Sequence, residues 1–416
     1  MKHIATNVDD NIIQMRAKAT EQLKKPGFAM DRYFYRSHVT YETELTQIIY
    51  KSWLYAGHIC QLKKIGDYFL FDVGEDSIIL SKGSNSEIHG FHNVCRHRGA
   101  RVAEQPQGNR NTFVCPYHGW VYNSDGSLKA ARHMEMKEGF DASCYGLKNV
   151  QVNIFQGLIF INCDLEAAAF LPQLENISRQ LEAYDLDNAK IAHAQTYTVE
   201  ANWKLVLENY LECYHCATSH RSYAKRHTLR ELEHDVEQLN KDMLERAEGV
   251  TAVDGIGEEY SAIYKQAINF GACVYASRYA LYDGFDTGSE SGKAVAPLMG
   301  NFKGFDGGTA DIQLGPLTFM LNYPDHCVLY RFTPRGITTT DMEVVWFVKG
   351  DAEEGKDYSK EDVIWLWHKT AMEDEYIILR NNAGVNSHFF EPGPYHPEFE
   401  FLCIEFIDWY LSVIAQ

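Results

Sequence analysis

Apolar and polar residues alternate along the chain in patterns that change from one region to the next. Near the N-terminus, Leu45, Ile48 and Ile49 fall at helical spacing and predict a helical lead. From about residue 53 to residue 163, short alternating runs are separated by Gly, Asn, Ser and Asp. These runs predict a small all-β domain with tight turns, one of them at Asp125-Gly126, a dipeptide typical of hairpins.

Beyond this β region the pattern becomes mainly helical. Apolar residues between 203 and 214 fall at helical spacing, and a charged stretch at 230–249 predicts a solvated helix. Alternating runs at 317–350 predict antiparallel strands. The segment 359–384 predicts a long helix that Ser359 caps and that ends just before Gly384. The chain is therefore predicted to be an α+β protein. Its expected parts are an N-terminal helical lead at 1–44, a small all-β domain at 45–163 and a catalytic domain at 164–416.

Composition narrows the classes of function. The 416 residues include 39 Lys and Arg against 57 Asp and Glu, a net charge of -18 that disfavours nucleic-acid binding. There is no early apolar stretch typical of a secretory signal, and no apolar run approaches the roughly 20 residues of a spanning helix. We therefore expect a soluble, cytoplasmic protein. Ten cysteines are too few for a disulfide scaffold, so clustered cysteines indicate metal binding or catalysis.

Two short Cys/His motifs lie inside the predicted β domain. Cys95-x-His97 is followed by Cys115-x-x-His118, and each motif has a glycine just past its histidine. A structural zinc site is one interpretation of two cysteines and two histidines. Glycine, however, lets the backbone approach a bulky inorganic sulfide. The pattern favours a 2Fe-2S cluster with both thiolates on one iron and both imidazoles on the other.

A second pair of histidines lies in the predicted helical region. His215 and His220 are five residues apart, about 500° around an ideal helix, so they cannot share one helix face. We therefore expect the helix to unwind at 217–219. Two histidines and one carboxylate form a facial triad that leaves open positions on iron(II).

These motifs resemble those of a known family. CRHRGA at 95–100 and CPYHGW at 115–120 look like the Rieske cluster motif. NWKLVLENYLECYHCATSH at 202–220 resembles the catalytic motif of Rieske non-haem iron oxygenase α subunits, and the resemblance extends from about 45 to 410. It implies a Rieske domain followed by a helix-grip catalytic domain, an antiparallel sheet with a long C-terminal helix.

The resemblance also implies the third iron ligand. In the family it is an aspartate on the C-terminal helix about ten residues before a glycine, and here Asp374 stands ten before Gly384. Glu373 and Glu375 are expected to point to other faces and to be solvated.

Glu212 lies three residues before His215, which on a helix would place the two on one face. In the family an acidic residue here links a metal-ligand histidine to a cluster-ligand histidine, often across a subunit boundary. Glu212 is therefore expected to act in catalysis by coupling the two centres. Cys213 and Cys216 are expected to pack the helix.

The substrate class follows from finer resemblances. Glutamate at 212, rather than aspartate, and the GVNS, EPGPY and DWY segments near the C-terminus resemble oxygenases that act on betaines and carnitine. These enzymes hydroxylate an N-methyl group, and formaldehyde is then lost. Aromatic faces hold a quaternary ammonium through cation-π attraction. The candidate aromatic residues are Tyr260, Tyr264, Phe270, Tyr275, Phe389 and Tyr395.

The expected partners complete the hypothesis. The chain has neither a ferredoxin cysteine run nor a convincing G-x-G-x-x-G after a strand, so a separate NAD(P)H-dependent flavin/iron-sulfur reductase is expected to supply electrons. The resemblance implies a homotrimer, O2 as co-substrate, and no nucleic-acid or membrane partner. Two alternatives stay open: an aromatic-ring-hydroxylating dioxygenase α subunit, and a zinc-stapled ligand-binding protein without redox chemistry.

Overall fold

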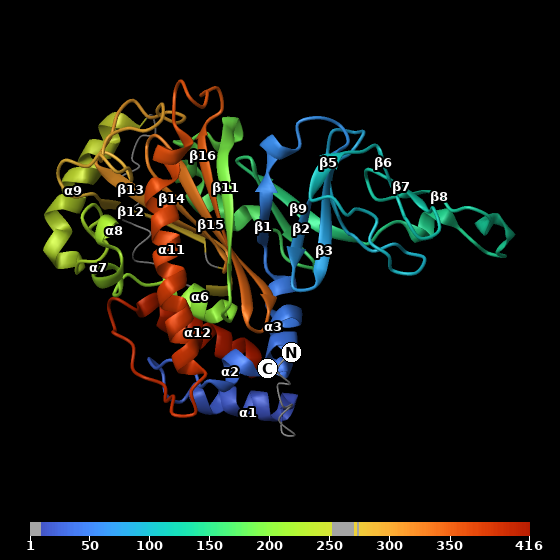
Figure 1. Cartoon of the computed structure of the whole chain (residues 1–416), viewed down its shortest axis with the longest axis horizontal. Coiled ribbons are helices and arrows are strands. Elements are labelled where there is room, and N and C mark those ends of the chain that lie inside the picture. Colours follow the sequence, from blue (N-terminus) through green and yellow to red (C-terminus); the bar gives the residue numbers. More distant parts are fainter. Residues whose placement is uncertain (1–9, 252–269, 273) are drawn as a thin grey trace. The chain divides into compact units, whose positions relative to one another are not determined.

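The structure is a computed structural model that describes residues 10–251, 270–272 and 274–416. Contacts divide the chain into two compact units, drawn in Figure 1. One unit comprises residues 50–171, and the other combines residues 172–416 with the N-terminal segment up to residue 49. Within the described ranges, none of the helices combines the length and the apolar character that a bilayer crossing requires. The finer division at residues 44 and 163 stays a prediction.

The unit at 50–171 is a β domain, as the alternating runs predict. Its aromatic core joins Tyr68, Phe91, Phe113 and Tyr122, which are all buried. A seven-stranded sheet has the order β1-β10-β9-β4-β3-β2-β5, and β6, β7 and β8 form a second sheet. The strands are β1 (Leu54–His58), β2 (Asp67–Val73), β3 (Asp76–Lys82), β4 (Ile88–His92), β5 (Gln107–Asn109), β6 (Thr112–Val114), β7 (Val121–Asn123), β8 (Leu128–Ala130), β9 (Asn149–Phe155) and β10 (Leu158–Asn162).

The other unit is built on a six-stranded antiparallel sheet crossed by a long helix, α11 (Lys360–Val385). The side chain of Ser359 caps α11 by accepting from Asp362 N–H, as the sequence predicts, but the helix continues through Gly384 to Val385. The sheet has the order β11-β16-β15-β14-β13-β12. Its strands are β11 (Ala189–Val199), β12 (Val274–Ala280), β13 (Gly308–Leu314), β14 (Thr318–Asn322), β15 (Cys327–Gly336) and β16 (Thr339–Lys349). This is the helix-grip arrangement that the resemblance implies.

The N-terminal segment packs into this second unit through a buried polar network. Glu44 accepts hydrogen bonds from Lys204, from the Trp203 indole and from the Tyr410 hydroxyl, and both members of the Lys204–Glu44 ion pair are fully buried. Such a pair is retained only when each partner is satisfied, because an unpaired buried charge is costly. The remaining helices are α1 (Ile12–Gln22), α2 (Tyr33–Arg36), α3 (His38–Gln47), α4 (Leu171–Leu174), α5 (Ser178–Glu182), α6 (Trp203–Tyr210), α7 (Cys216–Ser219), α8 (Arg221–Ala224), α9 (Glu233–Val250) and α12 (Phe401–Ile414).

Candidate metal centres

The two Cys/His motifs form two loops with the same backbone hydrogen bonds. In each loop the cysteine N–H donates to the carbonyl five residues later, and the glycine four residues later donates back to the cysteine carbonyl. Gly99 and Gly119 have φ values of 83° and 71°, a left-handed conformation that glycine adopts without strain. A Cβ on either glycine would meet nothing, so the backbone conformation, and not close packing against protein, requires glycine at both positions.

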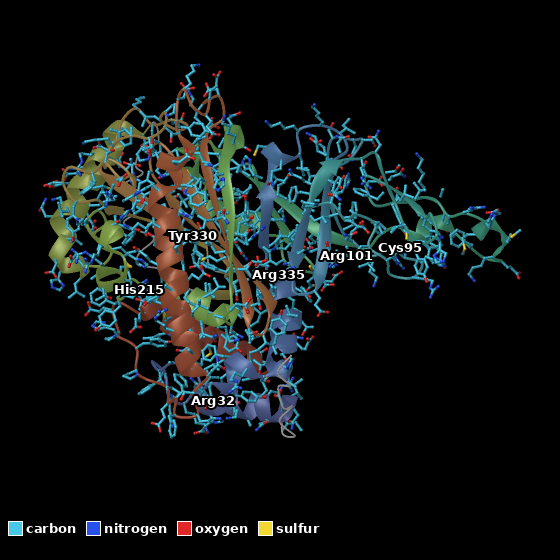
Figure 2. All side chains as sticks on the ribbon, viewed as in Figure 1. Arg32, Cys95, Arg101, His215, Tyr330 and Arg335 are labelled. Atoms are coloured by element: carbon cyan, nitrogen blue, oxygen red, sulfur yellow. A yellow bond between two sulfur atoms is a disulfide. The ribbon has the colours of Figure 1, made fainter. Side chains whose placement is uncertain are left out.

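Four side chains meet where these loops come together. The Cys95 and Cys115 thiols are buried in the aromatic core, and Figure 2 labels Cys95 in this unit. The His97 and His118 rings are exposed, with their Nδ1 atoms 3.2 Å apart. Burial raises the pKa of Cys115, and the Tyr122 hydroxyl lies 3.2 Å from the Cys95 sulfur. The structure thus brings together all four residues predicted to hold a cluster.

The spacing of these four ligand atoms distinguishes a cluster from a single ion. The ligands of one tetrahedral zinc lie about 2.0 to 2.3 Å from the ion and hence within about 4 Å of each other. Among the described residues, no three of the four donors lie within 4.8 Å of one another. Two thiols on one side and two imidazole nitrogens on the other therefore fit a 2Fe-2S group better than a structural zinc.

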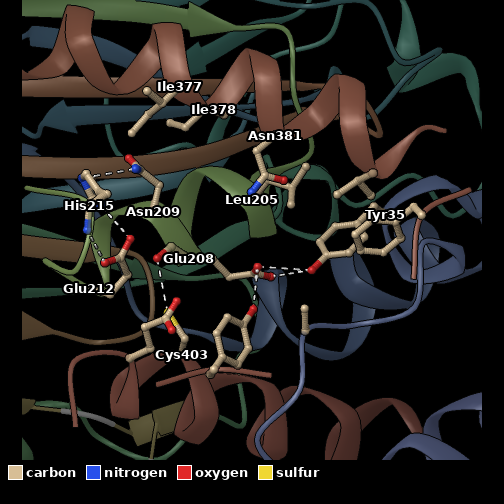
Figure 3. A pocket seen from close by; sticks show the side chains of 15 residues that line it. Tyr35, Leu205, Glu208, Asn209, Glu212, His215, Ile377, Ile378, Asn381 and Cys403 are labelled. Carbon is tan, nitrogen blue, oxygen red and sulfur yellow. Dashed lines mark hydrogen bonds and ion pairs between the residues drawn. The ribbon is translucent and has the colours of Figure 1, made fainter. Parts of the chain in front are cut away.

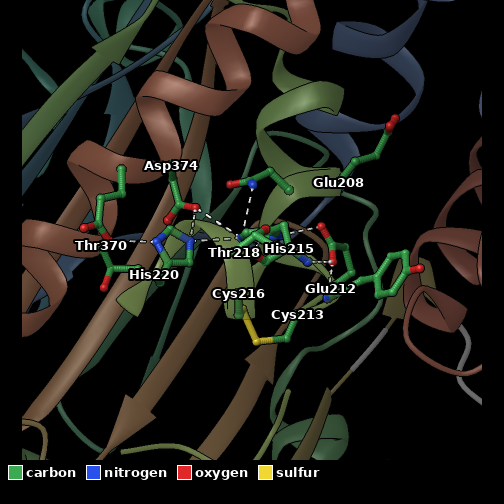
Figure 4. Close-up of polar contacts among 12 residues, drawn as sticks. Glu208, Glu212, Cys213, His215, Cys216, Thr218, His220, Thr370 and Asp374 are labelled. Carbon is green, nitrogen blue, oxygen red and sulfur yellow. Dashed lines mark hydrogen bonds and ion pairs between the residues drawn. A yellow bond between two sulfur atoms is a disulfide. The ribbon is translucent and has the colours of Figure 1, made fainter. Parts of the chain in front are cut away.

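The second centre lies between the segment at 212–220 and α11. His215 Nε2 and His220 Nε2 are 3.0 Å apart, and Asp374 Oδ1 lies 3.4 and 2.9 Å from them (Figure 4). Three ligand atoms at right angles and about 2.1 Å from one ion would be about 3 Å apart. The three side chains predicted as iron ligands are therefore positioned to occupy one face of a metal ion.

Interruptions of the helix near His215 and His220 orient the two imidazoles towards one point. The expected helix through residue 214 ends at Tyr210, and His215 and His220 instead flank the single turn of α7. His220 has φ −120° and ψ 71°, so the helical path is interrupted, though at His220 itself and not at 217–219 as expected. This break lets two imidazoles five residues apart face the same point.

A carboxylate supports each imidazole from behind. Glu212 lies 2.5 Å from His215 Nδ1, and Glu373 lies 2.9 Å from His220 Nδ1. With Nδ1–H donating to a carboxylate, the lone pair of Nε2 is free for a metal. The expectation that Glu373 is solvated is wrong, because its side chain is long enough to reach His220 from the position next to Asp374.

Glu212 supports His215 without sharing a helix with it. Its carboxylate also accepts from the backbone N–H groups of Tyr214 and His215, in the connection between α6 and α7. The expectation of a shared helix face is therefore wrong, whereas the contact that it was meant to explain is present.

The carboxylates and imidazoles at the triad stabilise each other's charged forms. Burial acts to lower the pKa of His215, but hydrogen bonds with Asp374 and Glu212 outweigh it and raise this pKa to about 9. Burial likewise acts to raise the pKa of Asp374, but the two imidazoles hold it below its ordinary value. The site favours positive charge, which suits a divalent cation.

Cys213 and Cys216 are joined in a disulfide beside the triad (Figure 4). The expectation that they pack the helix is wrong, because their sulfurs are bonded to each other and Cys213 lies in the connection between α6 and α7. The two cysteines are three residues apart, and this C-x-x-C pattern is the sequence signal that could have predicted the disulfide.

The candidate aromatic residues are scattered. Tyr260 and Tyr264 lie outside the described residues. Phe270 packs against Phe406 and Trp409 of α12, and Phe389 is 95% exposed. Tyr275 pairs with Gln313 across the sheet, and Tyr395 donates to Glu208. Of these four, Tyr395 lines the same cavity as His215 of the triad, and the other three do not line it.

A cavity of about 240 Å³ extends from the triad's supporting residues towards α2 (Figure 3). Asn209, Glu212 and His215 line one end, and Tyr35 and Glu208 line the other. Glu208 accepts from Tyr35 and Tyr395, and burial raises its pKa to about 7. Sequence analysis did not single out Glu208, because nothing local shows that its helix position is buried.

Comparisons with known proteins agree with this architecture. The Rieske 2Fe-2S domain matches residues 52–150, and the ring hydroxylating alpha subunit (catalytic domain) matches residues 186–416. The glycine betaine monooxygenase oxygenase subunit of Pseudomonas aeruginosa (strain UCBPP-PA14) is 34% identical over 385 residues, covering 92% of this chain and 88% of that protein.

Solved structures show the same fold. A quaternary ammonium Rieske monooxygenase, studied for carnitine oxidation, matches 95% of this chain and 97% of its own at a TM-score of 0.71 and 20% identity. Naphthalene 1,2-dioxygenase from Rhodococcus sp. matches 97% and 98% at a TM-score of 0.67 and 19% identity. Because the two scores are similar, the fold alone does not separate the two substrate classes.

Proposed function

The chain belongs to the Rieske non-haem iron oxygenase α subunits, in the group that includes quaternary ammonium monooxygenases, and we propose that it hydroxylates an N-methyl group of a betaine. The observation that carries the proposal is the convergence of His215, His220 and Asp374 in a chain similar to a glycine betaine monooxygenase subunit over nearly its full length. Glycine betaine, proline betaine and carnitine are the candidate substrates.

The reaction balances with electrons from outside the chain. One N–CH3 group, O2, two electrons and two protons give N–CH2OH and water. The C–N bond to the hydroxymethyl carbon then breaks, which releases formaldehyde and a proton and leaves the nitrogen with one methyl group fewer. We expect a separate NAD(P)H-dependent flavin/iron-sulfur reductase to supply the electrons.

In this proposal each residue of the chain has a defined task. Cys95, Cys115, His97 and His118 would hold the 2Fe-2S cluster, which would act as a one-electron relay with a potential raised by histidine ligation. His215, His220 and Asp374 would hold iron(II), which would supply the chemistry of O2 activation. The carboxylate of Glu212 orients the His215 ring, with the Nδ1 proton held between them. We expect a homotrimer in which Glu212 couples the triad to a neighbouring subunit's cluster.

The experiment starts from the aerobically purified protein, its visible spectrum and its iron content. Oxygen uptake and formaldehyde release are then measured with a surrogate reductase and three substrates: glycine betaine, proline betaine and L-carnitine. A red-brown protein that releases formaldehyde from one of them supports the proposal. A red-brown protein that is silent on all three but oxidises naphthalene would contradict the substrate class, and a colourless zinc protein would contradict the chemistry as well.

A further inference from the structure

One face of the catalytic sheet looks towards α11. The Tyr330 hydroxyl on β15 donates to the Trp367 carbonyl of α11, and Figure 2 labels Tyr330 beside that helix. Cross-strand pairing places Phe319 opposite Tyr330, and Gln313 opposite Phe319. Because side chains alternate along a strand, Asp311, two residues before Gln313, projects from this same face.

Asp311 is partly buried in this unit, and it lacks the partners that the unit's fully buried acidic residues have. Its Oδ1 atom is buried without a hydrogen-bond partner, and among the described residues no cation forms an ion pair with it. Burial alone raises its pKa to about 7. By contrast, Glu44, Asp306 and Asp325 pair with Lys204, Arg278 and His326, respectively, and Glu208 accepts hydrogen bonds from two tyrosine hydroxyls. A carboxylate with one buried oxygen and no counter-charge is costly, and the protein carries that cost here.

Aromatic rings surround this part of the sheet face. The Tyr210 ring, from α6, lies 4.5 Å from Phe319 and 5.2 Å from Tyr330, centroid to centroid. The Asp311 carboxylate is close enough to raise the pKa of Tyr210, to which burial contributes most, and the Tyr210 hydroxyl also lacks a partner. Burial raises the pKa of Tyr330, and Asp374 of the triad adds to the rise. The aromatic group is therefore near the unpaired carboxylate through Tyr210 and near the triad through Tyr330.

We propose that Asp311 is the counter-charge for the quaternary ammonium group of the substrate, with Tyr210, Phe319 and Tyr330 offering aromatic faces to its methyl groups. A quaternary ammonium has no N–H to donate, so it is recognised by charge and by π faces and not by directed hydrogen bonds. Asp311 is thus a specificity residue, and this inference rests on the proposed function.

The test separates charge from shape. The probes are glycine betaine, L-carnitine and 3,3-dimethylbutanoate, which carries a neutral tert-butyl group in place of the trimethylammonium group of glycine betaine. Calorimetric dissociation constants are measured with the iron-loaded protein at pH 8. Asp311→Asn should weaken binding of the preferred betaine by at least about tenfold, and change binding of 3,3-dimethylbutanoate by less than about threefold.

Two further variants guard against a folding artefact. Asp341→Asn, on β16 of the same sheet and at a carboxylate already paired with Arg335, should leave all dissociation constants unchanged. Asp311→Ser repeats the test should the asparagine variant lose its iron or its cluster spectrum. Equal weakening of the cationic and neutral probes, or no change for either, would overturn the role of Asp311. A wild-type protein that binds neither betaine would overturn the proposed function together with this inference.

Discussion

The cluster loops and the triad each contribute two histidines to the metal centre that we propose for them, but the two sites are assembled differently. The loops at 95–100 and 115–120 lie within one short stretch of chain, and matching backbone hydrogen bonds shape them. The triad combines two histidines of an interrupted helical segment with an aspartate of α11, which lies far along the sequence. The carboxylates of Glu212 and Glu373 contact the two histidines. Local backbone geometry therefore defines the first site, and tertiary packing defines the second.

The two sites also differ in how far their side chains are exposed to solvent. His97 and His118 are exposed, whereas the His220 side chain is only 2% exposed and that of Asp374 only 14%. An electron relay gains from imidazole edges that a partner can approach. An oxygen-activating site gains from restricted access of water. The two exposures fit the two tasks that we propose.

Buried charge marks a third difference. No Asp, Glu, Lys or Arg is among the buried residues of the unit at 50–171, which the structure describes completely. The other unit buries several, including Glu44, Lys204, Glu208 and Asp306. Its architecture therefore depends on ion pairs and hydrogen bonds that pH and substitution can disturb.

The largest expected effect comes from removing one triad ligand. Asp374→Ala leaves two imidazoles without their shared carboxylate, so we expect mononuclear iron content to fall and turnover to drop by more than about 100-fold, beyond what loss of a supporting residue costs. The visible spectrum of the cluster should be unchanged, because the loops form without α11. Iron analysis, spectroscopy and formaldehyde release measure the three quantities.

The reciprocal variant makes this comparison sharper. Cys115→Ser should abolish the cluster spectrum and reductase-driven turnover, while one iron per chain stays bound at the triad. A single substitution that emptied both sites would contradict the independence of the two regions.

These differences explain what the sequence could predict. Cys95, His97, Cys115 and His118 could be assigned together because their loop geometry is local and leaves a spacing pattern. Asp374 was identified only through a family resemblance, since no periodicity specifies which helix will pack against His215. The β domain and the capped long helix were predicted correctly for the same local reasons.

Other features had no local signal. The role of Glu373 was missed because helical phase separates it from Asp374 by about 100°, and side-chain length closes that gap. The burial of Glu208 depends on Tyr35 and Tyr395 from both ends of the chain. Contacts of this kind arise from tertiary packing, which single-sequence patterns do not encode.

The next largest effect is the pH dependence of stability that the buried Glu208 causes. Burial raises the pKa of Glu208 from 4.5 to about 7, so the folded state holds this proton more tightly than the unfolded state does. The free energy of unfolding should therefore fall by up to about 3 kcal/mol between pH 4.5 and pH 7 and level off above. Glu208→Gln keeps an acceptor for both tyrosines but does not titrate, so it should remove this fall.

Melting temperatures from pH 5 to pH 8 test this expectation. The difference in melting temperature between Glu208→Gln and wild type should grow with pH and then stay constant above about pH 7. Parallel curves for the two proteins would mean that Glu208 is not the buried acid responsible.

Substitution of Glu373, which contacts His220 Nδ1, is expected to have a smaller effect on iron binding and turnover. Glu373→Ala removes the carboxylate that fixes the Nδ1–H tautomer, which should weaken iron affinity or turnover by about 10- to 100-fold. Glu373→Gln retains an acceptor and should lose less. Glu375 lies on the same helix but forms no ion pair with either histidine among the described residues, so Glu375→Ala is the matched control. Equal losses for residues 373 and 375 would point to a general helix effect.

The smallest effect is expected at the cluster, where one side chain modulates a site that the backbone already shapes. The Tyr122 hydroxyl lies 3.2 Å from the Cys95 sulfur and accepts from the Arg96 N–H. A hydrogen bond to a ligand sulfur stabilises the reduced, more negative form of a cluster, so Tyr122→Phe should lower the reduction potential. One such bond is worth about 0.5 to 1.5 kcal/mol, or about 20 to 65 mV for one electron. Spectroelectrochemistry measures the shift, and an unchanged potential with an intact spectrum would show that Tyr122 only packs the core.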